Sequence, residues 1–158
     1  MLEVVDAMPE DEPFLLAVYA GARQEEVSGW GWDALQLEAF LHMQYRFQQQ
    51  SYRSRYPEAV VQLIVQDGRR IGKLLVAREH DAIVLVDIAL LPEHRNRGYG
   101  SAFMQSLQRE AEQCGKPIIL HVQTANRAKE LYERLGFQQV SLDSMYCEMK
   151  WVPASTHF

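Results

Sequence analysis

A short basic turn in the middle of the chain carries the residue types best suited to chemistry. An apolar run, Ile83–Leu91, ends at Pro92, and the glycine-containing segment Arg95–Ser101 (RNRGYGS) follows it. A helical apolar stripe then begins, formed by Phe103, Leu107, Ala111 and Cys114. A strand, a glycine turn and a helix in this order direct backbone N–H groups and the positive helix end at one spot. The pattern therefore predicts an anion site, most often one for a phosphate.

The glycine turn differs from the two common nucleotide-binding loops. A Walker loop has Lys-Ser or Lys-Thr after its last glycine, whereas Gly100 is followed by Ser101 and Ala102. A dinucleotide fingerprint needs a third glycine three residues after Gly100, where Phe103 stands. The remaining pattern, R-x-x-G-x-G, is by itself equally compatible with an ordinary tight turn.

A second motif lies further along the chain, at Asn126–Phe137 (NRAKELYERLGF). Its apolar residues share one helical face; they are Ala128, Leu131, Tyr132 and Leu135. Gly136 is placed to end this helix in a left-handed conformation. Together, R-x-x-G-x-G and N-x-A-x-x-L-Y-x-x-x-G-F resemble the Gcn5-related N-acetyltransferase (GNAT) superfamily. The resemblance extends from about Val61 to Met149, while the N-terminal part matches only in outline.

The resemblance implies a site for acetyl-coenzyme A and no metal. The residues that it assigns to this co-substrate are Ile88, Ala89, Leu90, Arg95, Asn96, Arg97, Gly98, Tyr99, Gly100, Ser101, Asn126 and Tyr132. In the family, the glycine turn holds the pyrophosphate, and the preceding strand offers its backbone to the pantetheine and the thioester. The N–H near Leu90 would then stabilise the oxyanion. Arg97 would add positive charge there, or it is an exposed surface arginine.

Two side chains of the second motif match family residues with defined roles. Tyr132 matches the tyrosine that protonates the leaving thiolate, which is suitable chemistry for a phenol; the alternative is a core tyrosine on an apolar helix face. Asn126 matches the asparagine that binds the pantetheine arm. It could instead only cap its helix, or do both.

The general base is the least defined part of the predicted site. Many family members have a glutamate on the strand before the turn, but here the sequence reads Val86-Asp87. Asp87 could therefore be a base, a substrate anchor or a structural acid. For the acceptor we consider Glu25, Glu26 and Trp30 as substrate-binding residues.

The charge is unevenly distributed along the chain. Residues 1–40 carry nine acidic residues and one basic residue, a net charge of −8, whereas the remainder has a net charge of +3. The resemblance implies that the N-terminal helices help to form the wall of the acceptor pocket. Acidic residues there would favour a cationic amine, although such acids can equally cap helices and solvate a surface. The net charge of −5 argues against nucleic-acid binding.

Length and composition predict one domain over residues 1–152 and a loose tail over 153–158. No apolar run is long enough for a membrane span, and the acidic N-terminus is unlike a signal peptide. Cys114 and Cys147 lie far apart and the histidines form no ligand pattern, so a cytoplasmic protein without metal is expected.

Hydrophobic periodicity and turn signals give the element order β-α-α-β-β-β-α-β-α-β-β. With the resemblance, this predicts an α/β (α+β) fold, in which about four helices flank a central mixed, mostly antiparallel sheet. The expected strands are Leu2–Asp6, Val60–Val65, Arg70–Ala77, Ile83–Leu91, Pro117–Val122, Gln138–Leu142 and Met145–Trp151. The first two helices are expected to end near Ala22 and Arg53.

The predicted activity is transfer of an acetyl group from acetyl-coenzyme A to a primary amine by direct attack in a ternary complex. Neither cysteine has the partners of a nucleophile. Two alternatives remain open: a protein N-terminal or lysine acetyltransferase, and a non-catalytic module that binds or senses acyl-coenzyme A. Many family members dimerise, so a homodimer is one arrangement that the resemblance allows.

Overall fold

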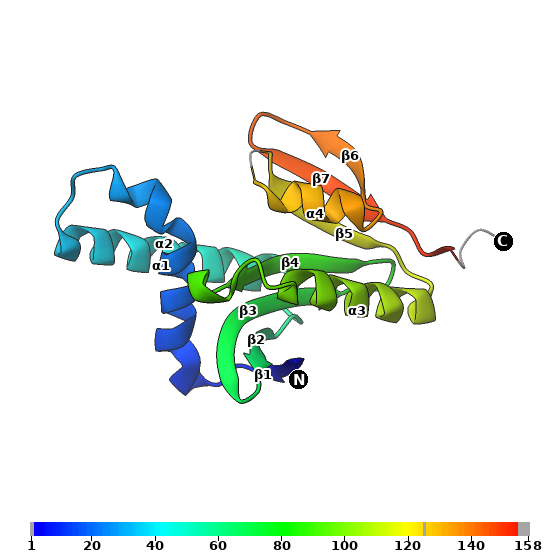
Figure 1. Cartoon of the computed structure of the whole chain (residues 1–158), viewed down its shortest axis with the longest axis horizontal. Helices are drawn as coiled ribbons and strands as arrows, with labels where there is room; N and C mark the ends of the chain where they lie inside the picture. Colours follow the sequence, from blue (N-terminus) through cyan, green and yellow to red (C-terminus); the bar gives the residue numbers. More distant parts are fainter. Residues whose placement is uncertain (1, 125, 155–158) are drawn as a thin grey trace. The chain divides into compact units, whose positions relative to one another are not determined.

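The computed structural model describes residues 2–124 and 126–154, without the side chains of Glu25 and Glu26 (Figure 1). The elements in chain order are β1 (Leu2–Asp6), the 3₁₀ turn η1 (Pro9–Asp11), α1 (Glu12–Ser28), α2 (Ala34–Arg55), β2 (Val61–Gln66), β3 (Arg69–Arg78), β4 (Ile83–Leu90), the 3₁₀ turn η2 (Pro92–His94), α3 (Tyr99–Cys114), β5 (Ile118–Gln123), α4 (Ala128–Arg134), β6 (Gln138–Leu142) and β7 (Tyr146–Trp151). The predicted order of strands and α-helices is confirmed.

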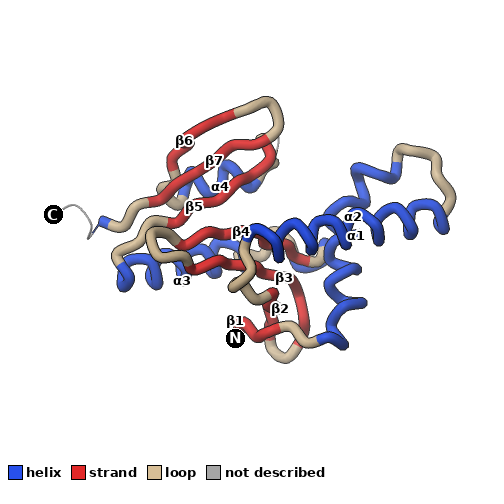
Figure 2. The backbone as a smooth tube through the Cα atoms, turned by 180° about the vertical axis from the view of Figure 1, so that it is seen from behind, coloured by secondary structure: helices blue, strands red, loops and turns tan. Residues whose placement is uncertain are grey.

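Seven strands form a mixed sheet in the order β1-β2-β3-β4-β5-β7-β6 (Figure 2). The ladders β1–β2, β2–β3, β5–β7 and β6–β7 are antiparallel. β4 and β5 are parallel, with Ile83–Leu85 opposite Ile118–Leu120. Parallel neighbours need a crossover connection, and α3 lies in the chain between these two strands. The mostly antiparallel sheet with four α-helices in the described part of the chain confirms the predicted fold class.

The end of α1 differs from the sequence prediction. α1 continues to Ser28 rather than ending near Ala22, and the buried side chain of Val27 gives its last turn an apolar contact surface. α2 begins after Asp33, whose carboxylate accepts the N–H of Gln36 at 2.8 Å. The Gln36 side chain accepts the N–H of Asp33 in return, so a capping box fixes this helix start.

Contacts divide the described chain into two compact units. The first runs to Leu75 and includes Asp87–Asn96. Its hydrophobic core is formed by Leu15, Tyr19, Tyr45 and Leu63. The rings of Tyr19 and Tyr45 meet edge to face, with centroids 5.6 Å apart. This packing holds α1, α2 and β2 around one core.

The second unit consists of Val76–Val86 and the chain from Arg97 onward. In α3 the predicted apolar stripe is buried at Phe103, Leu107 and Ala111. Cys114 was wrongly included in that stripe: it is exposed, because it is the last helical residue and the chain turns away at Gly115, whose φ is +70°.

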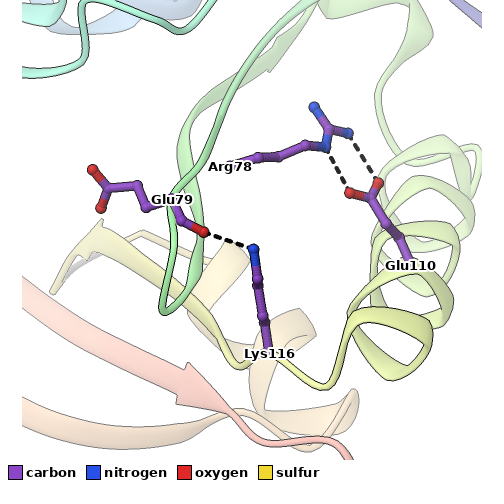
Figure 3. A network of polar contacts seen from close by, with 4 residues as sticks. All are labelled: Arg78, Glu79, Glu110 and Lys116. Carbon is purple, nitrogen blue, oxygen red and sulfur yellow. Dashed lines mark hydrogen bonds and ion pairs between the residues drawn. The ribbon is translucent and has the colours of Figure 1, made fainter.

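Two polar contacts join the end of β3 and the residue after it to α3 and the segment that follows α3, all in the second unit (Figure 3). Arg78 binds Glu110 through two hydrogen bonds, Nε–Oε2 at 2.6 Å and Nη2–Oε1 at 2.9 Å. Lys116 donates to the carbonyl of Glu79 at 2.9 Å. A bidentate pair fixes direction as well as distance, so these contacts orient α3.

No helix in the described residues is long and apolar enough to cross a membrane.

Candidate functional site

The turn between β4 and α3 has a backbone shaped to expose N–H groups. Asn96 and Gly98 have φ values of +61° and +81°, a left-handed conformation that Asn and Gly adopt most readily. Gly98 is the N-cap of α3, and no side chain caps this helix start. The first N–H groups of a helix have no partner within it, so those of Tyr99, Gly100 and Ser101 are available to an anion.

The two glycines of the turn have different surroundings, since Gly98 borders open space and Gly100 lies near Leu131. A Cβ at Gly98 would meet nothing within 4 Å, and one at Gly100 would lie 3.9 Å from Leu131 Cδ2. The positive φ alone accounts for glycine at position 98. At position 100 the protein itself would accept a methyl group, so packing does not require glycine there, whereas close approach of a ligand to the backbone would require it. These residues therefore fit the pyrophosphate of coenzyme A.

Arg95 and Arg97, which flank the turn, are both exposed. Arg95 Nε donates to the carbonyl of Leu90 at 3.2 Å. This bond ties the start of the turn to the end of β4 and leaves the terminal guanidinium nitrogens for another partner. The exposure of Arg97 agrees with its interpretation as a surface arginine. It is equally compatible with phosphate binding, which stays a prediction.

Tyr132 lies in α4 with 6% of its surface exposed. Its ring is 5.8 Å from that of Phe137, and Gly136 adopts the predicted left-handed conformation with φ +96°. The contact between Leu131 and position 100 places the helix of Tyr132 next to the start of α3. Within the second unit, the structure thus brings the two sequence motifs together.

Asn126 precedes α4 and has a measurable structural role. Its Oδ1 accepts the N–H of Ala128 at 2.8 Å, and its own N–H donates to the carbonyl of Gln123. The Asn126 side chain therefore closes the turn before α4, whereas the N-cap position itself is Arg127, which makes no side-chain cap hydrogen bond. The side chain is exposed, and its amide NH₂ group can still donate to a ligand.

Asp87 lies in the first unit, where it forms an ion pair that the sequence analysis missed. Its Oδ2 is 3.1 Å from Nζ of Lys73, and the side chains are 23% and 2% exposed, respectively. The Lys73 ammonium also lies 5.8 Å from the ring centroids of Tyr45 and Tyr52. The available signal was a single charged residue inside the apolar run Ile71–Ala77, because lysine is almost never fully buried unless it is paired.

Burial, followed by the nearby carboxylate of Glu12, raises the pKa of Tyr45 well above its usual range. Its ring therefore faces Lys73 as a neutral phenol at neutral pH. A neutral aromatic face attracts an ammonium through its quadrupole, so the ring of Tyr45 is a favourable neighbour for Lys73.

The backbone of Ala89 and Leu90 lies tightly against β3. A Cβ at Gly72 would come within 2.5 Å of the carbonyl oxygen of Ala89 and 2.8 Å of Leu90 Cδ2. Gly72 is thus needed for the close approach of β4. The side chains of Ile88, Ala89 and Leu90 are half-buried, and their predicted contribution is through the backbone alone.

The predicted acceptor residues are distributed around the end of α1. Trp30 is 41% exposed and forms an aromatic cluster with Trp32 and Phe40, with centroids 5.2 to 5.3 Å apart. The side chains of Glu25 and Glu26 lie outside the described residues. Some N-terminal acids have structural roles: Asp11 pairs with Arg70 at 3.0 Å, and Asp33 caps α2.

The comparison with known families is decisive for the class of protein. The model of the acetyltransferase (GNAT) family matches residues 22–137. This range covers most of the chain, including the glycine turn and the Tyr132 helix. The chain belongs to the GNAT acetyltransferase family, as the resemblance predicted.

The individual relatives share low sequence identity with this chain. The chain is 27% identical over 84 residues to a [ribosomal protein bS18]-alanine N-acetyltransferase of Haemophilus influenzae, covering 52% of this chain and 58% of that protein. It is 30% identical over 92 residues to the DEAD-box ATP-dependent RNA helicase 57 of Oryza sativa, covering 58% of this chain but 16% of the helicase. The chain thus spans less than two thirds of either relative.

Among solved structures, the PaiA N-acetyltransferase of Thermoplasma acidophilum in complex with coenzyme A superposes with a TM-score of 0.70. The match covers 96% of this chain and 99% of that one at 17% identity. At this identity the match establishes the shared fold.

Proposed function

We propose that this protein is an N-acetyltransferase that moves the acetyl group of acetyl-coenzyme A to a primary amine. The main support is the start of α3 at Gly98–Ser101, where no side chain caps the helix and Gly98 borders open space. The chain also belongs to the GNAT family. The coenzyme A bound to a relative of the same fold supports the choice of ligand. In this proposal residues 1–152 act as one cytoplasmic domain. Pro153, which was expected to belong to a loose tail, is fully buried.

Most of the predicted co-substrate residues have a definite task in the proposed reaction. The N–H groups of the glycine turn and the guanidinium of Arg97 bind the pyrophosphate. The backbone of Ile88–Leu90 binds the pantetheine and stabilises the oxyanion. Tyr132 donates a proton to the departing sulfur, and Asn126 binds the pantetheine arm. The amine attacks the thioester carbonyl directly, with no acyl-enzyme intermediate. As the C–N bond forms and the C–S bond breaks, the amine loses one proton to solvent, and Tyr132 regains from solvent the proton that it gave to the sulfur.

A small amine is the proposed acceptor, and Trp30, Glu25 and Glu26 are the residues proposed to bind it. A protein N-terminal amine is the second candidate, favoured by the similarity to an alanine N-acetyltransferase. A panel of small amines beside peptides that begin with alanine distinguishes the two. Coenzyme A binding without thiol release on that panel would instead support the sensing module.

Ligand-induced stabilisation tests the co-substrate. A ligand that binds only the native state raises its melting temperature, so acetyl-coenzyme A should raise Tm clearly more than ATP or NAD at equal concentration. Gly100→Glu places bulk and negative charge at the phosphates and should abolish the shift. The variant should keep the wild-type circular dichroism, because a Cβ at position 100 has only an ordinary contact with the protein at 3.9 Å. Equal shifts with all three ligands would refute the proposal.

A further inference from the structure

Lys73 is the most unusual residue of the first unit, and neither family motif includes it. Its side chain is 2% exposed, in the middle of β3. Transfer of an ammonium ion out of water is costly unless charged and polarisable partners compensate for it. The position of Lys73 therefore depends on the groups around its Nζ.

Those groups come from two elements that approach β3 within the same unit. Asp87, on β4, contributes a carboxylate oxygen at 3.1 Å. Tyr45 and Tyr52, on α2, contribute ring faces at 5.8 Å each. The spacing of seven residues puts both tyrosines on the same side of α2. The ammonium is thus held between one carboxylate and two aromatic rings.

The same arrangement leaves part of Asp87 accessible. Lys73 contacts Oδ2, whereas Oδ1 has no hydrogen-bond partner among the described residues, and the side chain is 23% exposed. Asp87 also directly precedes Ile88–Leu90, the segment whose backbone is proposed to bind the thioester. A carboxylate anchored through one oxygen can present the other oxygen in a fixed direction.

We propose that Lys73 is a positioning residue for acetyl transfer: it anchors Asp87 through Oδ2, so that Oδ1 accepts an N–H of the acceptor amine. This inference rests on the proposed function. Tyr45 and Tyr52 hold the ammonium in place, and Lys73 itself touches neither substrate. The amine then attacks along a direction set by Asp87, and misplacement of the carboxylate slows the reaction.

The first test compares Lys73→Met, Asp87→Asn and the double variant in the full chain. Each single change should lower kcat about 10²-fold, with the KM and the stabilising effect of acetyl-coenzyme A within about threefold of wild type. The double variant should be no slower than the slower single variant, because residues that act as a unit are non-additive. Lys150→Met, at an exposed position of β7, is the control and should keep wild-type kcat.

A milder pair of variants covers the case in which Lys73→Met does not fold. Tyr52→Leu removes one aromatic face from Lys73, whereas Tyr52→Phe retains it. We expect kcat to fall about threefold to tenfold for the leucine variant only, because only that variant removes an aromatic face that stabilises the desolvated ammonium.

The inference would be overturned if Lys73→Met kept the wild-type kcat, or if Tyr52→Leu and Tyr52→Phe had equal kcat. In either case an active wild-type protein would still uphold the proposed function. Additive losses in the double variant would also overturn it, since independent residues give additive effects. A wild-type protein that neither binds nor turns over acetyl-coenzyme A would refute the function, and this inference with it.

Discussion

The backbone carbonyl of Tyr132 accepts the N–H of Phe137 at 3.0 Å, and the rings of these two residues lie 5.8 Å apart. This bond spans the left-handed Gly136 and closes a Schellman motif, in which an apolar contact commonly joins the same two positions. The end of α4 therefore fixes the backbone and the ring of Tyr132 together. A proposed general acid is in this way held by the helix cap that follows it.

Replacing Tyr132 with phenylalanine tests the acid role directly. The ring and its contact with Phe137 remain, so only the proton donor is lost. We expect kcat to fall by roughly 10²–10⁴, the range for positioned acid–base catalysis, with coenzyme A affinity within a few-fold of wild type. Steady-state kinetics and ligand titration measure the two quantities. Tyr146→Phe, at an exposed tyrosine of β7, is the control. If Tyr132→Phe kept the wild-type kcat but had a lower Tm, Tyr132 would be a core residue only.

Gly72→Ala should damage stability and catalysis together. The new Cβ would meet the carbonyl oxygen of Ala89 at 2.5 Å, and this backbone atom cannot move without shifting β4. We expect a loss of about 1–3 kcal/mol in the free energy of unfolding, as for overpacked cores, measured by urea denaturation. A fall in kcat should accompany it. Gly29→Ala has nothing within 4 Å and should be nearly neutral; similar behaviour of both variants would show that β3 and β4 tolerate a wider spacing.

The ion pair of Arg78 and Glu110 should make stability depend on pH in the acid range. Hydrogen bonds from Arg78 hold the pKa of Glu110 below its usual value, against the opposing effect of partial burial. Stability from this pair is therefore present above the unfolded-state pKa and is lost as pH falls through the lowered one. Arg78→Gln should cost about 0.5–1 kcal/mol at neutral pH, since the pair is partly exposed.

The difference between wild type and Arg78→Gln should disappear at acidic pH, where Glu110 is protonated in both proteins. Urea denaturation across a pH series measures it. Arg109→Gln changes an exposed arginine next to Glu110 on the same helix and should leave the acid dependence unchanged. A difference that persists when Glu110 is protonated would assign the effect of Arg78 to packing rather than to charge.

The enzyme's preference among acceptor amines should follow the charge of the amine. Because residues 1–40 carry a net charge of −8, kcat/KM for amines of similar size should fall from cationic to anionic acceptors. The difference should narrow at high salt, which screens exposed charges. Changing Glu25 and Glu26 to glutamine should weaken the preference without affecting acetyl-coenzyme A binding. The same changes at Glu3 and Glu10 alter net charge equally and should have less effect; a best acceptor with acidic groups beside its amine would refute this prediction.

Much of the fold and the family were predictable from local sequence. Gly98, Gly136 and the Asp33 cap act within a few residues of the chain, so their turns and helix ends follow from residue type. The two motifs around Gly100 and Tyr132 likewise identified the family, because each is a contiguous pattern on one strand–turn–helix or one helix.

The sequence by itself therefore determined the order of the elements, the GNAT family and the glycine turn, since these depend on neighbours along the chain. Only the tertiary structure revealed the pairing of Lys73 with Asp87 between two tyrosines of α2, and the need for Gly72 beneath Ala89. These contacts join residues from separate elements, and strand register and helix docking decide which side chains meet. A buried charge or a missing Cβ signals that some partner exists, but the folded chain alone identifies that partner.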